Sequence, residues 1–262
     1  MIAENKPHHK ENISEKRVKN IKITVEYDGT AYHGWQRQKE LPTVQGSIET
    51  AIHTMTGETV SLIGAGRTDA GVHALNQVAN FRIKSRLTPD VFFKGLNSLL
   101  PPDIVIKRCE EVDESFHSRF DAKSKVYHYR ILNRAAPIAI SRQYVWHIWK
   151  PLDLDAIEDS LPFLTGRHDF SAFEGSGSER KSPIRTVHNI DMRIIDDDYL
   201  IFSIEADGFL KFMVRNIVGT LVYVGLGKIK PSEIKGILES KDRRRAGVTA
   251  PAHGLFLMLI RY

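Results

Sequence analysis

Apolar and polar positions follow regular spacings along most of the chain from residue 21 onward. Alternation with a period of two predicts strands, and apolar residues recurring at three- and four-residue steps predict helices. Strands are predicted at residues 21–28, 60–65, 78–83, 104–112, 125–132, 145–149, 187–195, 199–206 and 255–260. Helices are predicted at residues 43–56, 89–100, 153–164 and 209–224, and in a short segment that Pro231 initiates.

Strands and helices come in two successive groups, which predicts an α+β protein built from two similar halves. We expect the halves at residues 21–115 and 116–262, with mostly antiparallel sheets and helices on one face. The other face would be free to form a groove. Residues 1–20 mix Lys and Glu without an apolar signal segment and predict a disordered tail, and residues 166–183 predict a mobile insertion.

Composition narrows the class of protein. The net charge of +5 suits a polyanionic partner, although charge alone equally fits a solvated surface. Cys109 is the only cysteine, which excludes an internal disulfide and a thiolate metal cluster and suits a reducing cytoplasm. No apolar run approaches the roughly 20 residues that span a bilayer. The basic residues that gather in two segments are Lys241, Arg243, Arg244 and Arg245, and Arg180, Lys181 and Arg185.

The candidate chemistry begins at Asp69, which lies in a turn between Gly66 and Gly71. Glycines on both sides allow tight or positive-φ conformations and a close approach by a ligand. A carboxylate among such small residues is presented to its surroundings rather than packed away. The plainer alternative is that Asp69 only caps backbone amides of the turn, as Asp commonly does.

Arg215 is the second candidate, because it lies among apolar residues of the predicted helix at 209–224. A guanidinium there is costly to bury unless it meets an anion or extends to solvent. The functional hypothesis is an ion pair with Asp69 across the two halves, which would orient the carboxylate and favour its ionised form.

Metal and cofactor motifs are missing from the sequence. The 11 histidines include no H-E-x-x-H arrangement, and the glycines near Gly64 match no nucleotide-binding loop, so we predict neither metal nor cofactor. Asp196, Asp197 and Asp198 resemble a hairpin tip more than a magnesium site. His73 either tunes the turn or is structural, and Trp35 either bears on RNA or anchors a loop.

Five blocks of the sequence, in order, resemble the tRNA pseudouridine synthase A family from about residue 21 to residue 262. They are Tyr27-Asp28-Gly29-Thr30 with Gly34-Trp35-Gln36-Arg37-Gln38, the segment Gly66-Arg67-Thr68-Asp69-Ala70-Gly71-Val72-His73, Phe116-His117-Ser118-Arg119-Phe120 with Lys125-Val126-Tyr127-His128-Tyr129, residues 213–219, and Thr249-Ala250-Pro251-Ala252-His253-Gly254-Leu255.

The resemblance implies an enzyme that isomerises uridine to pseudouridine at positions 38, 39 and 40 of tRNA anticodon stem-loops, without a cofactor. It implies that Asp69 is the nucleophile, that Tyr127 contacts the uracil, that Arg67 helps displace the nucleotide, and that Arg215 partners the carboxylate. A basic RNA-binding cleft between the halves and a homodimer that holds tRNA across both subunits are implied too. The basic residues above would contact phosphates.

Several alternatives stay open at this point. Asp69 could add to uracil C6, attack ribose C1′ or remove a ribose proton. Tyr127 could be a packed strand tyrosine, judged by strand propensity alone. Two rival functions are a non-catalytic RNA-binding protein and a related synthase that acts on another RNA or at other positions.

Overall fold

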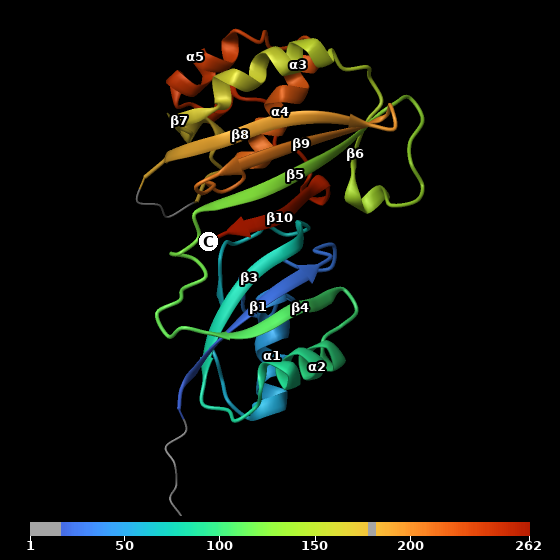
Figure 1. Ribbon diagram of the computed structural model, residues 1–262. Coiled ribbons are helices and arrows are strands. Elements are labelled where there is room, and N and C mark those ends of the chain that lie inside the picture. Colours follow the sequence, from blue (N-terminus) through green and yellow to red (C-terminus); the bar gives the residue numbers. More distant parts are fainter. Residues whose placement is uncertain (1–16, 178–181) are drawn as a thin grey trace, which may run out of the picture.

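The computed structural model describes residues 17–177 and 182–262 of the chain. Its centre is one sheet with strand order β4-β1-β3-β10-β5-β9-β8-β7, to which β2 and β6 add short pairings (Figure 1). The strands are β1 (Lys19–Tyr27), β2 (Ile63–Gly64), β3 (His73–Ile83), β4 (Ile104–Val112), β5 (Ser124–Asn133), β6 (Trp146–Ile148), β7 (Gly166–Asp169), β8 (Ile184–Ile195), β9 (Tyr199–Ala206) and β10 (Leu255–Arg261). The predicted fold class, α+β with a mostly antiparallel sheet, is confirmed.

In the N-terminal half, α1 (Val44–Thr56) and α2 (Pro89–Leu99) pack against β1, β3 and β4. The Thr43 side chain caps α1 by accepting from the Gly46 amide, and Gly57 ends the helix in a left-handed conformation. The stripe formed by Val44, Ile48 and Ile52 is fully buried, as the helical spacing predicts.

The C-terminal half carries α3 (Leu154–Ser160), α4 (Met213–Gly225) and α5 (Glu233–Ser240) over β5, β9 and β8. Eleven of the 13 residues of α4 are buried, so this helix is the centre of the C-terminal core. Short 3₁₀ segments at Arg142–Tyr144, Leu161–Leu164, Ser171–Phe173, Arg243–Arg245 and Ala252–Gly254 connect the larger elements.

The last strand joins the two halves. β10 lies parallel to β3 on one side and antiparallel to β5 on the other, so the sheet is continuous across the molecule. The register produces a row of opposed residues across four neighbouring strands and β9, all buried on one face: Tyr27, Ala74, Leu257, Tyr127 and Ile204. Residues far apart in the sequence therefore lie side by side on one face of the sheet, and this row of five residues is called the floor.

Several predicted segments differ from the structure: of residues 60–65 only Ile63–Gly64 form a strand, and the strand expected at 78–83 begins at His73. The helix expected from residue 209 begins at Met213, because Phe212 has a φ of 62° and the Lys211 carbonyl accepts from the Gly175 amide instead of continuing the helix. The strand expected from Ile21 begins at Lys19. Residues 166–183 were expected to form a mobile insertion, which is wrong for residues 166–173: β7 pairs with β8, and Phe170 and Phe173 are fully buried.

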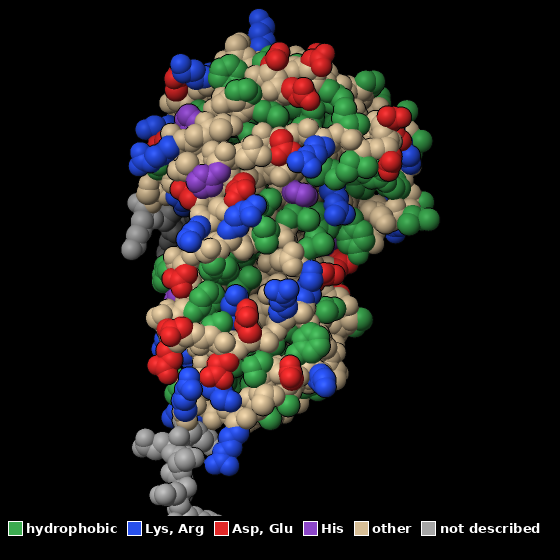
Figure 2. Space-filling model, in the orientation of Figure 1, with side chains coloured by type: hydrophobic (Ala, Val, Ile, Leu, Met, Phe, Trp, Pro, Cys, Tyr) green, Lys and Arg blue, Asp and Glu red, His purple; other side chains and the backbone are tan. Residues whose placement is uncertain are grey.

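Two further expectations concern the residues that the structure does not describe and the helix-free face of the sheet. The tail up to residue 16, and Arg180 with Lys181, lie outside the described residues. Figure 2 shows Lys and Arg side chains interspersed with Asp and Glu side chains over the face in view, and a groove on the helix-free face of the sheet stays a prediction. Among the residues that the structure describes, no helix is both long enough and apolar enough to cross a membrane.

Candidate active site

The loop that carries Asp69 is held from three directions. The Trp35 amide donates to the Thr68 carbonyl at 3.1 Å, the Gly71 amide donates to the Tyr32 carbonyl at 3.3 Å, and the Gln77 side chain donates to the Gly66 carbonyl at 2.8 Å. A side chain on Gly34 would lie 2.5 Å from the Thr68 carbonyl oxygen, so this close approach requires glycine. Asp69 is therefore presented on a fixed backbone.

Arg215 meets this carboxylate from the other half of the molecule. Its Nη1 donates to Asp69 Oδ2 at 3.1 Å, across 146 residues of sequence, which is the pairing that the sequence predicts. Its Nε donates to the Ala250 carbonyl at 2.8 Å, and the guanidinium lies 4.8 Å from the Phe212 ring centre. Arg215 is near the N-terminal end of α4, where the helix dipole disfavours a cation, so the carboxylate also relieves that repulsion.

The Asp69 carboxyl is electrostatically poised. Burial raises its pKa, and the Arg215 hydrogen bond, the Arg215 charge and the Lys211 charge lower it, but the net change is upward. The Arg215 pair favours the ionised form, as expected, yet only partly compensates for burial. An acid with a raised pKa and one specific charge partner is typical of functional sites.

Tyr127 stands on the floor row beside this pair. Its side chain is 7% exposed, its ring packs edge-on against Phe209 with 5.1 Å between centres, and its hydroxyl makes no hydrogen bond with any described residue. Burial raises its pKa, and the nearby Tyr27 and Asp69 raise it further. The hydroxyl therefore keeps its proton and is free to donate to a ligand.

The site lies on the helix-bearing side of the sheet. Tyr127 shares its face with Tyr27, whose hydroxyl is 2.8 Å from Thr68 Oγ1, and the partner Arg215 comes from α4. The Asp69–Arg215 pair and Tyr127 therefore lie on the side of the sheet that α4 covers, not on its helix-free face.

The remaining predicted residues take different positions. Arg67 is exposed, and its side chain makes no hydrogen bond or ion pair with a described residue. Arg185 is half-buried and donates to the Ser182 and Ile184 carbonyls. Of the second basic segment, three members have partners within the chain: Lys241 with Asp169 at 3.2 Å, Arg244 with Asp242 at 2.8 Å, and Arg245 with the Gly236 carbonyl at 3.3 Å.

Arg243 is the most enclosed of these basic residues. It donates to the Gly247 carbonyl at 2.8 Å, to Asn216 Oδ1 at 2.9 Å and to Thr249 Oγ1 at 3.0 Å. Burial lowers its pKa. These contacts join the 3₁₀ turn that carries Arg243 to α4, the helix that presents Arg215.

Sequence patterns did not single out four contributors to the site: Tyr27, Phe209, Phe212 and Lys125. Phe209 and Phe212 precede α4 in an irregular segment, so a helical interpretation concealed their positions. Tyr27 and Lys125 depend on strand register, which the spacing of apolar residues does not reveal. The sequence block that contains both Lys125 and Tyr127 was the signal that could have identified Lys125.

Trp35, His73 and the Asp196–Asp197 tip occupy positions that suit structural roles. Trp35 is 1% exposed and packs against Tyr27 and Gly64. His73 is 2% exposed, accepts from the Gly29 amide through Nδ1 and contacts the His253 carbonyl through Nε2. Asp196 and Asp197 form the left-handed tip between β8 and β9. Within residues 17–177 and 182–262, no group of three or more potential ligands is arranged to hold a metal.

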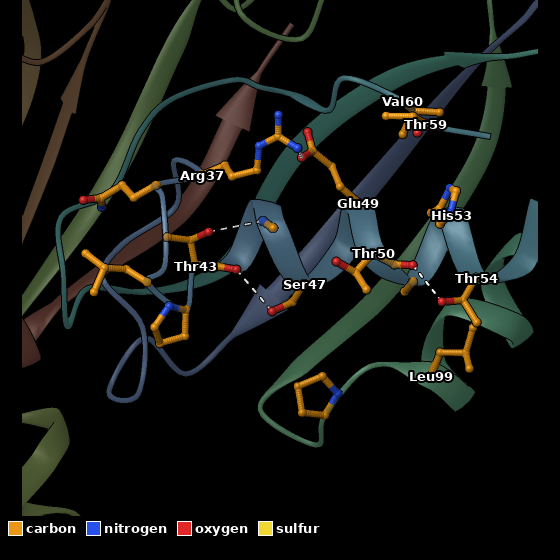
Figure 3. A pocket seen from close by; sticks show the side chains of 16 residues that line it. Arg37, Thr43, Ser47, Glu49, Thr50, His53, Thr54, Thr59, Val60 and Leu99 are labelled. Atoms are coloured by element: carbon orange, nitrogen blue, oxygen red, sulfur yellow. Dashed lines mark hydrogen bonds and ion pairs between the residues drawn. The ribbon is translucent and has the colours of Figure 1, made fainter. Parts of the chain in front are cut away.

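A groove of about 690 Å³ follows α1 and contains none of Asp69, Tyr127 or Arg215 (Figure 3). Hydroxyl side chains such as Thr43, Ser47, Thr50 and Thr54 line it. At its rim Arg37 pairs with Glu49 at 3.1 Å. Because α1 supplies the caps and packing of the N-terminal half, this groove is separate from the candidate chemistry.

The sequence matches a known protein family over most of its length. The family profile described as "tRNA pseudouridine synthase" matches residues 23–121 and 163–262. The chain is 51% identical to the tRNA pseudouridine synthase A of Thermoanaerobacter sp. (strain X514) over 245 residues, which cover 94% of this chain and 100% of that relative. It is 50% identical to the protein of the same name from Acetivibrio thermocellus, with the same coverage.

A solved structure entitled "Crystal Structure of a Cbf5-Nop10-Gar1 Complex" aligns at a TM-score of 0.35 and 12% identity, over 90% of this chain and 57% of that chain. That likeness is too weak to support an argument. The family match and the two close relatives are sufficient: this chain belongs to the tRNA pseudouridine synthase family, a family of isomerases.

Proposed function

We propose that this protein isomerises uridine to pseudouridine in tRNA, at positions 38, 39 and 40 of the anticodon stem-loop, with Asp69 as the nucleophile. The observation that carries the proposal is the Asp69–Arg215 pair, presented on a glycine-flanked loop beside the free hydroxyl of Tyr127. The family membership and the names of the relatives support tRNA as the substrate.

The reaction breaks the C1′–N1 bond, turns the uracil and rejoins it through C5. No external group or electron is transferred, so the proposal needs neither a redox cofactor nor ATP. A uridine in a stem must first leave the helix, which costs a few kcal/mol of stacking. Arg67, which is exposed two residues from Asp69, would enter the space that the nucleotide leaves.

Tyr127 and Arg215 would act after the nucleotide has left the helix. Tyr127 would contact the uracil and donate its hydroxyl proton as a hydrogen bond, because its raised pKa keeps the hydroxyl protonated. Arg215 would hold the Asp69 carboxylate in line with the ribose or C6. The three chemical routes for Asp69 are all compatible with this arrangement, and each ends with removal of the C5 proton by a base.

RNA would be held mainly through its backbone, which suits an enzyme that accepts several adjacent uridines. Lys241, Arg244, Arg245 and Arg185 are the described candidates for phosphate contacts, with Arg243 behind them. Arg180 and Lys181 complete the proposed set. We further propose a homodimer that holds tRNA across both subunits, and a cytoplasmic location.

The test is conversion of tRNA transcripts labelled at uracil C5, with release of the label as the readout. Wild-type protein should release label from uridines 38–40, and Asp69→Asn should not. Release that survives Asp69→Asn would refute the assignment of the nucleophile. Pseudouridine mapping in cells that lack the gene decides the positions, because unchanged anticodon stem-loops would favour the related synthase that acts elsewhere.

A further inference from the structure

Lys125 lies on the same face of the sheet as the floor, without a partner. It precedes Tyr127 by two residues on β5, so both side chains share a face, and its opposed residues Ala206 and Ile260 are buried. Its ammonium reaches the Asp69 loop: a side chain on Gly66 would begin only 3.3 Å from Lys125 Nζ. No described residue makes a hydrogen bond or an ion pair with this ammonium.

The surroundings of Lys125 are cationic. The pKa of Lys125 is lowered to about 8, first by burial and then by the charges of Arg119 and Arg185, and the charge of Asp207 opposes this shift. Arg119 is exposed and has no carboxylate partner, and Arg185 donates only to backbone carbonyls. The positive charges of Lys125, Arg119 and Arg185 therefore lie near one another, and among the described residues the Asp207 carboxylate opposes them.

Such an arrangement costs stability unless an anion completes it, because a half-buried cation loses hydration and is repelled by its neighbours. Asp69 is not that anion. The cations that lower the pKa of its carboxyl are Arg215 and Lys211, not Lys125. Lys125 therefore faces the Asp69 loop while its charge remains available.

We propose that Lys125, flanked by Arg119 and Arg185, binds a backbone phosphate of the RNA next to the extruded uridine and so positions that nucleotide against Asp69. The assignment rests on the proposed function. Two residues of strand span about 6.6 Å, which is comparable to the separation of a base from its own phosphate. A uracil at Tyr127 would therefore bring a phosphodiester to Lys125, where a compact ammonium suits a phosphate oxygen.

Equilibrium binding tests the assignment without turnover. Fluorescence anisotropy would compare anticodon stem-loop RNA binding to Asp69→Asn protein and to Asp69→Asn/Lys125→Met protein. Loss of one charge-assisted contact should raise Kd about 10-fold or more. The slope of log Kd against log salt should become less steep by about 0.7 to 0.9. Lys125→Arg should retain most of the affinity, and Lys94→Met, an exposed lysine on α2, should change neither quantity.

A methylphosphonate scan identifies the contact. One neutral methylphosphonate is placed in turn at each phosphate of the stem-loop. At one position it should weaken binding to the Lys125 protein and leave binding to the Lys125→Met protein unchanged. Equal losses in both proteins at every position would overturn the proposal. If the Asp69→Asn protein shows the coupling but wild-type protein converts no uridine, the proposed function is refuted and the phosphate site stands.

Thermal unfolding separates this assignment from a structural role. Removing an unpaired, repelled charge should leave the Tm of Lys125→Met unchanged or raise it. A lowered Tm together with a loss of affinity that no single methylphosphonate reproduces would show a structural lysine and contradict the proposal.

Discussion

Asp28 and Asp69 have similar exposure but opposite surroundings. Their side chains are 30% and 27% exposed, and each lies where the two halves meet. Asp28 accepts from the Thr30 amide, from the Thr30 hydroxyl at 2.6 Å and from the Tyr144 hydroxyl at 2.6 Å. The Asp69 carboxylate accepts from Arg215 alone among the described residues.

The two pKa values move in opposite directions as a result. Burial acts to raise the pKa of both carboxyls. At Asp28 the hydrogen bonds from Thr30 and Tyr144, with the charge of His73, outweigh burial, and the pKa is lowered. At Asp69 the cations do not outweigh burial, and the pKa is raised. Exposure therefore does not distinguish the two carboxylates, whereas hydrogen bonding does.

A carboxylate whose lone pairs are occupied by the protein stabilises the fold, and one with free lone pairs can react. Asp28 joins the end of β1 to the 3₁₀ turn at Arg142–Tyr144 and is a structural junction. Asp69 is held by its backbone and oriented by a single guanidinium, which leaves oxygen atoms available to a substrate.

The largest expected effect is on activity at Asp69. Asp69→Asn keeps the shape and removes the charge, so label release from tRNA should fall by at least about 10³-fold. Because this carboxyl is destabilised by burial, Tm should stay the same or rise. A variant that keeps activity within 10-fold of wild type would erase the proposed difference between Asp69 and Asp28.

Arg215→Met should have the next largest effect, a loss of about 10²-fold in kcat/KM. Without the guanidinium, the pKa of Asp69 rises further because only Lys211 still opposes burial. The proposed nucleophile works ionised, so the acidic limb of the pH–rate profile should shift to higher pH. An unshifted limb would show that Arg215 does not control the ionisation of Asp69.

The sequence predicted which residues meet at the site better than the strand order around them. Asp69, Arg215 and Tyr127 were singled out by a glycine-flanked turn, a cation in an apolar helix and the family blocks, and the structure brings all three together. The insertion of β10 between β3 and β5 left no local signal, because strand order depends on contacts between distant segments.

The same reason explains the residues that were missed. Tyr27 and Lys125 reach the site only through the register of β1, β3, β10 and β5. The segment before α4 has an apolar spacing that predicts helix, but Phe212 adopts a left-handed conformation and the chain turns there. Tertiary hydrogen bonding overrides local propensity at that point.

Asp28→Asn should reverse the pattern seen at Asp69. Asn keeps one acceptor oxygen, so it can accept from Thr30 or from Tyr144 but not from both, and the free energy of unfolding should fall by about 1–3 kcal/mol. Activity per folded molecule should change less than about 5-fold, because the hydrogen bonds of Asp28 go to Thr30 and Tyr144 and not to Asp69 or Arg215. Chemical denaturation with tRNA conversion measures both quantities. Tyr144→Phe serves as a milder control that removes one of the three hydrogen bonds.

The smallest expected effect is the pH dependence of stability at His73, next to Asp28. Its Nδ1 accepts from the Gly29 amide, so the ring is neutral and the 3.0 Å approach to Asp28 Oδ1 becomes an ion pair only on protonation. Burial is the largest influence on the pKa of His73 and lowers it below the ordinary 6.5, despite the opposing charge of Asp28.

The unfolded chain therefore binds this proton more readily than the folded chain. The stability that the neutral ring contributes is complete above about pH 6.5 and is lost as the pH falls through the lowered pKa, by at most about 1.4 kcal/mol per pH unit. His128 also has a lowered pKa, so the informative comparison is between wild type and His73→Gln. Gln offers a donor and an acceptor but no titration, so denaturation between pH 5 and pH 8, the range in which an ordinary histidine titrates, should show a shallower slope in the variant. Equal slopes would mean that the Asp28 junction, unlike Asp69, is insensitive to protonation at its neighbour.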